Sequence, residues 1–181
     1  GSADAAATLK LLNIISKANL SELELAEIGL SLGADVPFCL IGGTAYVSGI
    51  GERIETLNTP EMSYVLLKNR EKLSTGQMYK TLDSYNVHSD KDLQKMITGI
   101  KEENLQLICD NIFNAFEFCW DFNDMIKPFE TFSPKKTFLS GSGPTVCALF
   151  DEDIKAIDCY NSLKTIGAKY AKSKNVGIEL A

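Results

Sequence analysis

The chain has 181 residues, of which 45% are hydrophobic and 23% are charged, and its formal net charge is −6. This composition is that of an ordinary soluble globular protein, and the length allows one domain or one and a half. The negative charge does not favour a nucleic acid or an anionic membrane as a partner, and we expect neither. It does not exclude a phosphate compound, because backbone amides can bind phosphate locally.

The chain has five cysteines, an odd number, and they are widely spaced in apolar runs. This pattern predicts buried thiols in a reducing cytoplasm rather than disulfides or a zinc site. His88 is the single histidine and lies in a polar stretch that predicts an exposed loop, so no metal site is expected. No apolar run is long enough to span a membrane, and no signal peptide is recognised.

The first part of the chain predicts two helices followed by a β-hairpin. Ser2 is the expected N-cap of the first helix, and Asp4 lies in its first turn, where a negative charge is favourable. Ser21 and Glu24 form a capping-box pattern at the start of the second helix, and Gly33 follows its end. Periodicity and turn residues place these elements at residues 2–17, 21–32, 44–47 and 53–57.

Pro60 marks the start of a second region, with the order strand, helices, strand, strand, helix and strand. This order predicts a split β-α-β (ferredoxin-like) sheet with extra helices in the first crossover, and an α+β fold class. The strongest helical pattern is the apolar series from Leu105 to Phe116. The expected strands are 64–67, 136–139, 145–150 and 176–180, and the expected helices are 75–82, 93–100, 105–116, 125–126 and 153–166.

Three stretches are typical of a site that handles a phosphate group. Ser140–Pro144, between two strands, predicts either a plain hairpin turn or a nest of backbone amides that binds an anion. Gly1–Asp4 places N–H groups at a helix start, although any Ser-capped helix does the same. We expect Pro37 to hold Asp35 in an extended conformation, among apolar neighbours that partly desolvate it. Asp35 is then either a carboxylate aimed at a substrate or a residue that makes an Asx-turn to its own backbone.

These stretches, in this order, resemble the GHMP small-molecule kinases. The matching residues are Ser2-Ala3-Asp4-Ala5-Ala6, Leu32–Phe38, Gly42–Ala45, Gly51-Glu52, Ser74-Thr75, Asn114–Glu117 and Gly141-Ser142-Gly143, and the resemblance extends over essentially the whole chain. It implies the remainder of an N-terminal ATP-binding domain at residues 1–58 and a C-terminal ferredoxin-like domain at residues 59–181. It also implies transfer of the ATP γ-phosphate, with Mg²⁺, to a hydroxyl of a small-molecule substrate.

Within the family, the matching residues are similar to the branch whose acceptor is a cytidine-diphosphate-linked methylerythritol, in non-mevalonate isoprenoid biosynthesis. The resemblance implies that Asp35 is the catalytic aspartate, which orients or deprotonates the accepting hydroxyl. Thr75 and Tyr79 would contact the substrate, with the Tyr79 ring near the cytosine, although this ring is as consistent with helix packing. The residues implied to bind ATP phosphates are Gly1, Ser2, Ala3, Asp4, Gly141, Ser142 and Gly143.

The chain departs from the family pattern at its start. The family's first strand with its lysine, the segment that holds the cytidine, and most of the phosphate loop have no counterpart, and neither Lys10 nor Lys17 matches that lysine. We therefore expect an N-terminally truncated form with little or no kinase activity. We also expect it to self-associate through apolar surface that the missing strands would cover.

Two other functions remain open at this point. One is a GHMP kinase with a different acceptor, homoserine or a phosphorylated mevalonate. The other is a ferredoxin-like binding module without catalysis, which would bind neither ATP nor an acceptor and would be indifferent to the substitution Asp35→Asn.

Overall fold

The computed structural model describes residues 1–68 and 74–173, and these residues form two compact units. The first unit comprises residues 1–59 and the second comprises residues 60–173, and each is described by itself. In this part of the chain, no helix is long and apolar enough to cross a membrane.

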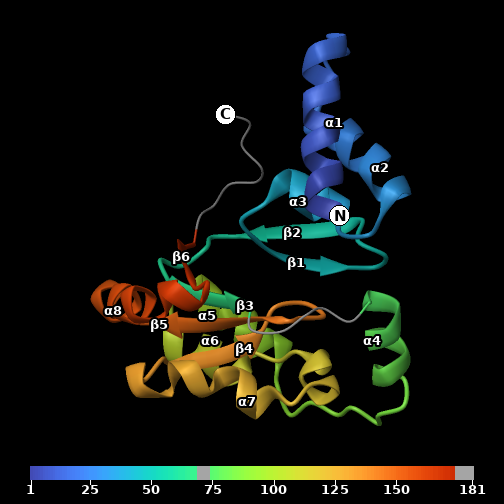
Figure 1. Cartoon of the computed structure of the whole chain (residues 1–181). Coiled ribbons are helices and arrows are strands. Elements are labelled where there is room, and N and C mark those ends of the chain that lie inside the picture. Colours follow the sequence, from blue (N-terminus) through green and yellow to red (C-terminus); the bar gives the residue numbers. More distant parts are fainter. Residues whose placement is uncertain (69–73, 174–181) are drawn as a thin grey trace. The chain divides into compact units, whose positions relative to one another are not determined.

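The first unit consists of three helices and a β-hairpin, drawn in blue and cyan in Figure 1. Its elements are α1 (Ser2–Ser16), α2 (Glu22–Leu32), α3 (Val36–Ile41), β1 (Thr44–Ser48) and β2 (Arg53–Leu57). The strands of the hairpin are antiparallel. The two longer helices and the hairpin are confirmed, whereas α3 has no counterpart among the predicted elements.

The two longer helices of this unit begin differently. Gly1, not Ser2, is the N-cap of α1, and no side chain caps this end, so that part of the prediction is wrong. Because glycine has no side chain, the backbone N–H groups of the first turn receive no side-chain cap from position 1. The capping box of α2 is confirmed: the Glu24 N–H donates to Ser21 Oγ at 3.3 Å, and the Ser21 N–H donates to the Glu24 carboxylate at 2.8 Å.

Close helix packing positions α3. The buried core of the first unit is formed by Ala6, Leu25, Val36 and Leu40. Gly29 of α2 faces α3 so closely that a Cβ atom there would lie 2.9 Å from Cγ1 of Val36. A larger residue at this position would therefore push α2 and α3 apart.

The second unit is built on a four-stranded antiparallel sheet (Figure 1). Its strands are β3 (Ser63–Lys68), β4 (Lys136–Leu139), β5 (Thr145–Phe150) and β6 (Lys169–Lys172), in the spatial order β4-β5-β3-β6. This order is that of the predicted ferredoxin-like sheet, and the α+β fold class is confirmed. The strand predicted at residues 176–180 lies outside the described residues, and β6 pairs with β3 at the edge of the sheet.

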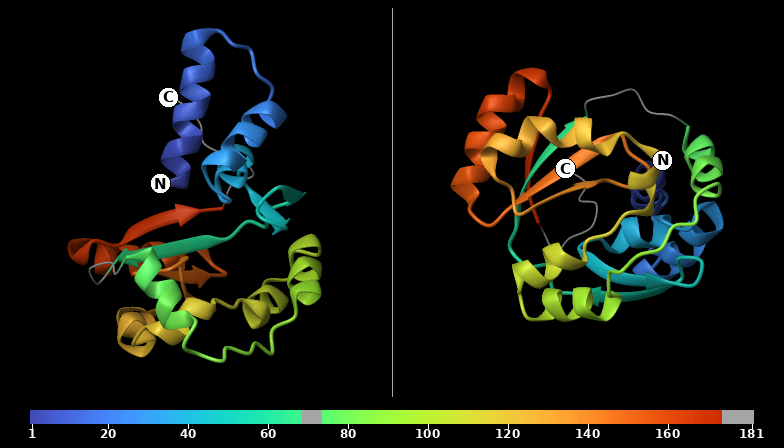
Figure 2. Two further views of the ribbon diagram at one scale, coloured as in Figure 1. Left: turned by 90° about the vertical axis from the view of Figure 1, so that its right-hand side faces the viewer. Right: turned by 90° about the horizontal axis from the view of Figure 1, so that it is seen from below.

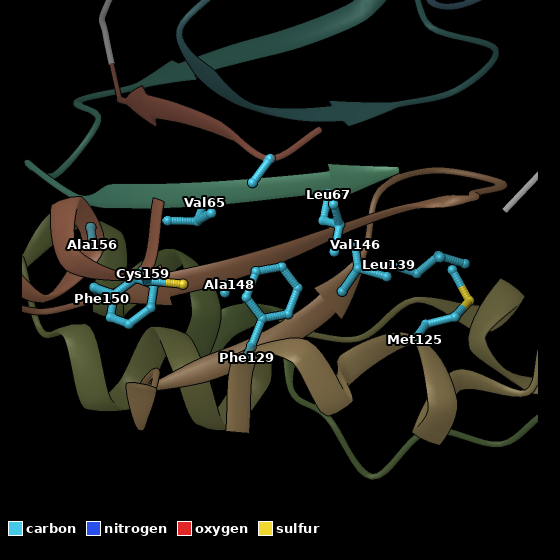
Figure 3. Packing of buried hydrophobic residues seen from close by; sticks show 11 residues of the cluster. Val65, Leu67, Met125, Phe129, Leu139, Val146, Ala148, Phe150, Ala156 and Cys159 are labelled. Atoms are coloured by element: carbon cyan, nitrogen blue, oxygen red, sulfur yellow. The ribbon is translucent and has the colours of Figure 1, made fainter. Parts of the chain in front are cut away.

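Helices lie on both sides of this sheet. The helical elements are α4 (Thr75–Leu82), α5 (Leu93–Lys101), α6 (Leu105–Asn111), the 3₁₀ helix η1 (Ala115–Cys119), α7 (Phe122–Ile126), the 3₁₀ helix η2 (Lys127–Phe132), α8 (Asp153–Leu163) and the 3₁₀ helix η3 (Lys164–Ile166). The two views of Figure 2 place α8 on one side of the sheet and the α5–α6 pair on the other. On the α8 side, Phe129 and Phe150 lie within a fully buried apolar core (Figure 3).

The helix predicted over residues 105–116 is wrong in its length. α6 ends at Asn111, and Ile112 has an extended backbone with a ψ of 126°. The remaining apolar residues of the series are carried by an extended segment and by η1. The physical reason is a set of hydrogen bonds to a distant loop, which are described with the site.

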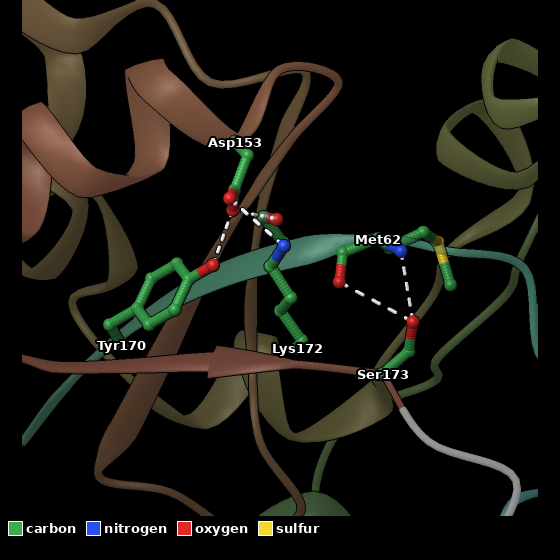
Figure 4. Close-up of polar contacts among 6 residues, drawn as sticks. Met62, Asp153, Tyr170, Lys172 and Ser173 are labelled. Carbon is green, nitrogen blue, oxygen red and sulfur yellow. Dashed lines mark hydrogen bonds and ion pairs between the residues drawn. The ribbon is translucent and has the colours of Figure 1, made fainter.

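Asp153, at the start of α8, links three elements of the second unit (Figure 4). Its carboxylate accepts hydrogen bonds from the Tyr170 hydroxyl and from Ser63 Oγ, the latter at 2.7 Å, and lies 2.9 Å from Lys172 Nζ. Hydrogen bonds from Tyr170, Lys172 and Ser63 lower the pKa of Asp153 to about 2. The cluster therefore ties β3, β6 and α8 together as long as the carboxyl is ionised.

We expect this cluster to make stability depend on pH in the acid range. An unfolded aspartate has a pKa of about 3.9, so the lowered pKa of Asp153 stabilises the fold above pH 4, and this contribution is lost as the pH falls towards 2. Asp153→Asn should lower the melting temperature at pH 7 and reduce its fall between pH 4 and pH 2.5, measured by circular dichroism. Asp158→Asn, on the exposed side of the same helix, is the control and should behave as the wild type. An unchanged pH profile in Asp153→Asn would contradict the assignment.

Candidate active site

The start of α1 presents backbone N–H groups at an exposed helix end. The first intrahelical hydrogen bond runs from the Ala5 N–H to the Gly1 carbonyl, at 2.9 Å. The N–H groups of Ser2, Ala3 and Asp4 have no acceptor among the residues that the structure describes. Unpaired amides at the positive end of a helix dipole are suited to hold a phosphate group.

Asp35 is the N-cap residue of α3, with a φ of −87° and a ψ of −11°. The expected extended conformation is wrong, because Pro37 lies in the first turn of a short helix, where its missing N–H loses no hydrogen bond. The Asp35 side chain is exposed rather than desolvated, and it makes no capping hydrogen bond. The Asx-turn alternative is therefore not observed, and the carboxylate is free to meet a ligand.

The first unit brings Asp35 and the start of α1 into the same region. The helices α1 and α3 are in contact, and Ala6 of α1 and Val36 of α3 belong to the same buried cluster. Burial raises the pKa of the Cys39 thiol on α3, and the charge of Asp35 raises it further. Asp35 directly precedes α3, which shares its buried core with α1, so the two predicted site segments lie on elements that pack together.

A turn of the β-hairpin supports the loop that carries Asp35. Gly51, in the turn between β1 and β2, has a φ of +104°, a conformation that favours glycine. A Cβ atom at this position would lie 2.1 Å from the carbonyl oxygen of Ala34, the residue before Asp35. The absence of a side chain at Gly51 thus allows the two backbones to touch.

In the second unit, the predicted glycine-rich stretch forms a tight turn between β4 and β5. The Ser140 N–H donates to the Thr145 carbonyl at 2.8 Å, and the Gly143 N–H donates to the Ser140 carbonyl at 2.9 Å. The N–H groups of Gly141 and Ser142 have no acceptor within the described part of the chain. The turn is therefore a hairpin and also presents two free amides, so the two interpretations of this stretch are compatible.

The carbonyl groups of this turn are held by side chains from the segment around η1. Asn114 Nδ2 donates to the carbonyl oxygens of Leu139 and Gly141, both at 2.8 Å. Trp120 Nε1 donates to the Ser142 carbonyl at 3.3 Å. These bonds require Asn114 to leave the helical path, which explains why α6 stops before the apolar series ends.

Two further contacts hold the turn against η1. The Leu139 N–H donates to Glu117 Oε1 at 2.9 Å. Burial raises the pKa of the Glu117 carboxyl, and this hydrogen bond partly opposes the shift. Gly143 has a φ of +74°, and a Cβ atom there would lie 2.9 Å from Nε1 of Trp120. The indole ring therefore packs directly on the backbone of the turn.

This part of the site is the one that sequence reasoning missed. Asn114 and Glu117 match the family pattern without a predicted role, and Trp120 is not among the predicted residues. A signal was present, because an asparagine followed three residues later by a glutamate is typical of a new helix start. The Asn114 side chain does cap η1, although Asn114 Oδ1 accepts from the Phe116 N–H, at 3.0 Å, and the Glu117 carboxylate accepts from the Leu139 N–H instead of completing a capping box.

The predicted substrate residues lie on α4, which also contacts η1. Thr75 and Tyr79 are exposed, and α4 begins with a capping box between Ser74 and Gln77. The Tyr79 ring meets the Phe116 ring edge to face, with centroids 5.0 Å apart, yet 54% of the residue remains exposed. The ring therefore packs on η1 and leaves a surface that a ligand can reach.

The predicted site residues thus fall into two groups. Gly1–Asp4 and Asp35 lie together in the first unit, while Thr75, Tyr79 and Gly141–Gly143 lie in the second unit, where η1 links them. Over residues 1–68 and 74–173, no three histidine, cysteine, aspartate or glutamate side chains gather in a way that could hold a metal ion.

Known proteins with a similar sequence include several named kinases. Residues 1–43 match the family described as GHMP kinases N terminal domain. A curated 4-diphosphocytidyl-2-C-methyl-D-erythritol kinase from Clostridium botulinum is 37% identical over 175 residues, covering 91% of this chain and 61% of the relative. The kinase of the same name from a Thermoanaerobacter species is 38% identical and covers 99% of this chain and 65% of the relative. The chain therefore spans less than two thirds of the length of these relatives.

Solved structures show the same fold. A crystal structure of 4-(cytidine 5'-diphospho)-2C-methyl-D-erythritol kinase matches 94% of this chain and 63% of its own, with a TM-score of 0.75 and 22% identity. The L. major mevalonate kinase, solved with R-mevalonate, covers 98% of this chain and 66% of its own, with a TM-score of 0.73 and 12% identity. Homoserine kinase from Cytophaga hutchinsonii covers 90% and 61%, with a TM-score of 0.64 and 16% identity.

The close contact between Gly51 and Ala34 predicts that a side chain at position 51 destabilises the fold. Gly51→Ala combines a strained φ with a clash against backbone, so we expect it to lower the free energy of unfolding by more than about 1 kcal/mol. Gly167→Ala is the matched control, since its φ is +96° but nothing lies within 4 Å of the added Cβ atom. Urea unfolding followed by circular dichroism measures both. Equal losses in the two variants would show that the close approach to Ala34 contributes nothing.

Proposed function

Because this chain belongs to the GHMP kinase family, we propose that it forms part of an ATP-dependent kinase whose acceptor is 4-diphosphocytidyl-2-C-methyl-D-erythritol. The reaction transfers the γ-phosphate of ATP to a hydroxyl of that compound. The observation that carries this proposal is the similarity to kinases of that name over 91% of the chain.

The geometry of both units supports phosphoryl transfer as the reaction class. Such transfer depends on positioning and on charge stabilisation more than on covalent chemistry. In this proposal the exposed Asp35 carboxylate orients the accepting hydroxyl or takes its proton. The amides of Gly1–Asp4 and of Gly141–Gly143 are the groups that stabilise the phosphate charge.

We include ATP as the phosphate donor and Mg²⁺ as its companion ion. Mg²⁺ is usually bound by one or two carboxylates together with phosphate oxygens and water, and not by a cage of protein ligands. This fits the described residues, which offer the exposed carboxylate of Asp35 near the start of α1 but no group of three metal-binding side chains. When bound, the ion would neutralise charge on the transferred phosphate.

The acceptor is assigned to the face of α4. Thr75 offers a hydroxyl and Tyr79 a half-exposed ring, and an aromatic face of this kind can stack on a nucleobase such as cytosine. We further assign residues 1–58 to the N-terminal domain of the family and residues 59–181 to its C-terminal domain. The described cysteines are all free thiols, which supports a reducing compartment such as the cytoplasm.

The direct test is a phosphoryl-transfer assay on the complete gene product that contains this chain. The acceptors are 4-diphosphocytidyl-2-C-methyl-D-erythritol and homoserine, offered separately with ATP and Mg²⁺. We expect turnover of the first, and Asp35→Asn should lower its kcat by about 10²-fold to 10⁴-fold because a general base or orienting group is lost.

The control for this assay is Asp158→Asn, a carboxylate on the exposed side of α8. It should leave kcat and KM unchanged. Turnover of homoserine in place of the cytidine compound would change the substrate assignment. A complete absence of turnover would favour a binding module, and full activity of Asp35→Asn would remove the catalytic role of that residue.

We also propose that the 181-residue chain self-associates through α1. Leu12, Ile14 and Ile15 of this helix are between 56% and 68% exposed, and exposed apolar patches favour association. Light scattering at increasing protein concentration should show species larger than a monomer, and Ile15→Lys should reduce them. The matched control Ile154→Lys changes an isoleucine that is 59% exposed on α8 and should not. A monomer at all concentrations contradicts the proposal.

A further inference from the structure

We propose that Asn114 is a positioning residue that sets the direction of the Ser142 N–H towards a bound phosphate. This inference rests on the proposed function, since it assumes that the turn between β4 and β5 meets phosphate oxygens. It concerns a residue that does not itself touch the ligand.

The argument begins with the geometry of one peptide unit. The Gly141 carbonyl and the Ser142 N–H belong to the same planar peptide group, and in a trans peptide they point in opposite directions. The described backbone has its cis bond elsewhere, between Gly143 and Pro144. Asn114 Nδ2 holds the Gly141 carbonyl at 2.8 Å. The Ser142 N–H is therefore directed away from Asn114, and it has no acceptor among the described residues.

The neighbouring peptide units are fixed in the same way. The Ser140 carbonyl accepts from the Gly143 N–H at 2.9 Å, which orients the other free amide, that of Gly141. The Ser142 carbonyl accepts from Trp120 Nε1 at 3.3 Å. Every carbonyl from Ser140 to Ser142 is thus held, whereas the two free N–H groups are left for a ligand.

Only an asparagine amide satisfies all the contacts at position 114. Its Oδ1 accepts from the Phe116 N–H at 3.0 Å and so starts η1, while its Nδ2 donates to the carbonyls of Leu139 and Gly141. An aspartate retains the acceptor and loses the donor, because an ionised carboxylate only accepts hydrogen bonds. The acceptor role and the donor role can therefore be separated by a single substitution.

The position also conflicts with the local sequence pattern. The apolar series from Leu105 to Phe116 favours an unbroken helix, but the backbone becomes extended at Ile112 and again at Asn114. Local preferences that are overridden in this way are expected at functional sites. Here the override is explained by the two hydrogen bonds that Asn114 donates to the turn.

The test compares Asn114→Asp with Asn104→Asp in the complete gene product. Asn104 is also an N-cap, and its Oδ1 accepts from the Leu107 N–H at 3.0 Å, so the same exchange of atoms leaves that cap in place. Asn114→Ser is the second variant, because serine is a good N-cap without the carboxylate charge. Inorganic triphosphate is titrated into ¹⁵N-labelled protein, and the shift of the Ser142 amide resonance gives its dissociation constant.

We expect triphosphate to shift the Ser142 amide in the wild type and in Asn104→Asp with equal affinity. Both variants at position 114 should bind it at least about 10-fold more weakly while keeping their circular dichroism spectrum, since one misdirected amide costs a charge-assisted hydrogen bond. The proposal is overturned if the variants bind as the wild type does, if the Ser142 amide does not respond in the wild type, or if both variants unfold.

The phosphoryl-transfer assay separates this result from the proposed function. Triphosphate binding that depends on Asn114 without any phosphoryl transfer would leave the positioning role intact and remove the kinase assignment. If both variants at position 114 transfer the phosphoryl group with unchanged kcat and unchanged KM for ATP, the kinase assignment stands and the positioning role of Asn114 is removed.

Discussion

The side-chain amide of Asn114 is the contact on which the site in the second unit depends. One carboxamide group accepts the hydrogen bond that starts η1 and donates the two that hold the turn between β4 and β5. Because η1 lies beside that turn, Trp120 and Glu117 reach it as well. The same short helix carries Phe116, which packs on Tyr79 of α4. A single polar group therefore organises both the free amides and the surface proposed for the acceptor.

Glycine residues allow close backbone contacts near the other candidate site residues. Gly51 touches the backbone of Ala34 beside Asp35, and Gly29 allows α2 to pack tightly on α3, the helix that begins directly after Asp35. In the second unit, Gly143 allows the Trp120 ring to lie on the turn. These contacts leave little freedom for the backbone, and small displacements would matter in the proposed phosphoryl transfer, whose rate depends on alignment. Rigid placement of the backbone is thus a feature of the candidate site residues in each unit taken by itself.

The site also shows why net charge is a poor guide to what a protein binds. The chain carries a formal charge of −6, yet the groups that we assign to phosphate are neutral backbone amides at a helix start and in a tight turn. Such amides act at hydrogen-bond distance, where their aligned dipoles outweigh the weak, screened field of distant carboxylates. Acidic residues on the surface therefore do not oppose the proposed function.

Local sequence signals determined much of this fold. Apolar periodicity and, at α2, a capping box were sufficient for α1, α2, α4 and α5, and turn residues between apolar runs were sufficient for the hairpin and for β3, β4 and β5. The edge strand β6, at Lys169–Lys172, was not predicted. Residue type and motif likewise singled out Asp35 and the turn at residues 140–144. The helices and the hairpin depend on contacts between residues a few positions apart, and such contacts leave a regular pattern.

Only the tertiary structure decided where α6 ends, that a short helix begins directly after Asp35, and that Trp120 contacts the turn between β4 and β5. The two carbonyls bound by Asn114 lie 25 and 27 residues further along the chain, so no local period records them. Leu139 is buried, and an unpaired carbonyl there would cost more free energy than a shortened helix, so the hydrogen bond to Leu139 outweighs the helical preference of the apolar series. The sequence by itself determined the elements and the candidate chemistry, and long-range hydrogen bonds decided how that chemistry is held.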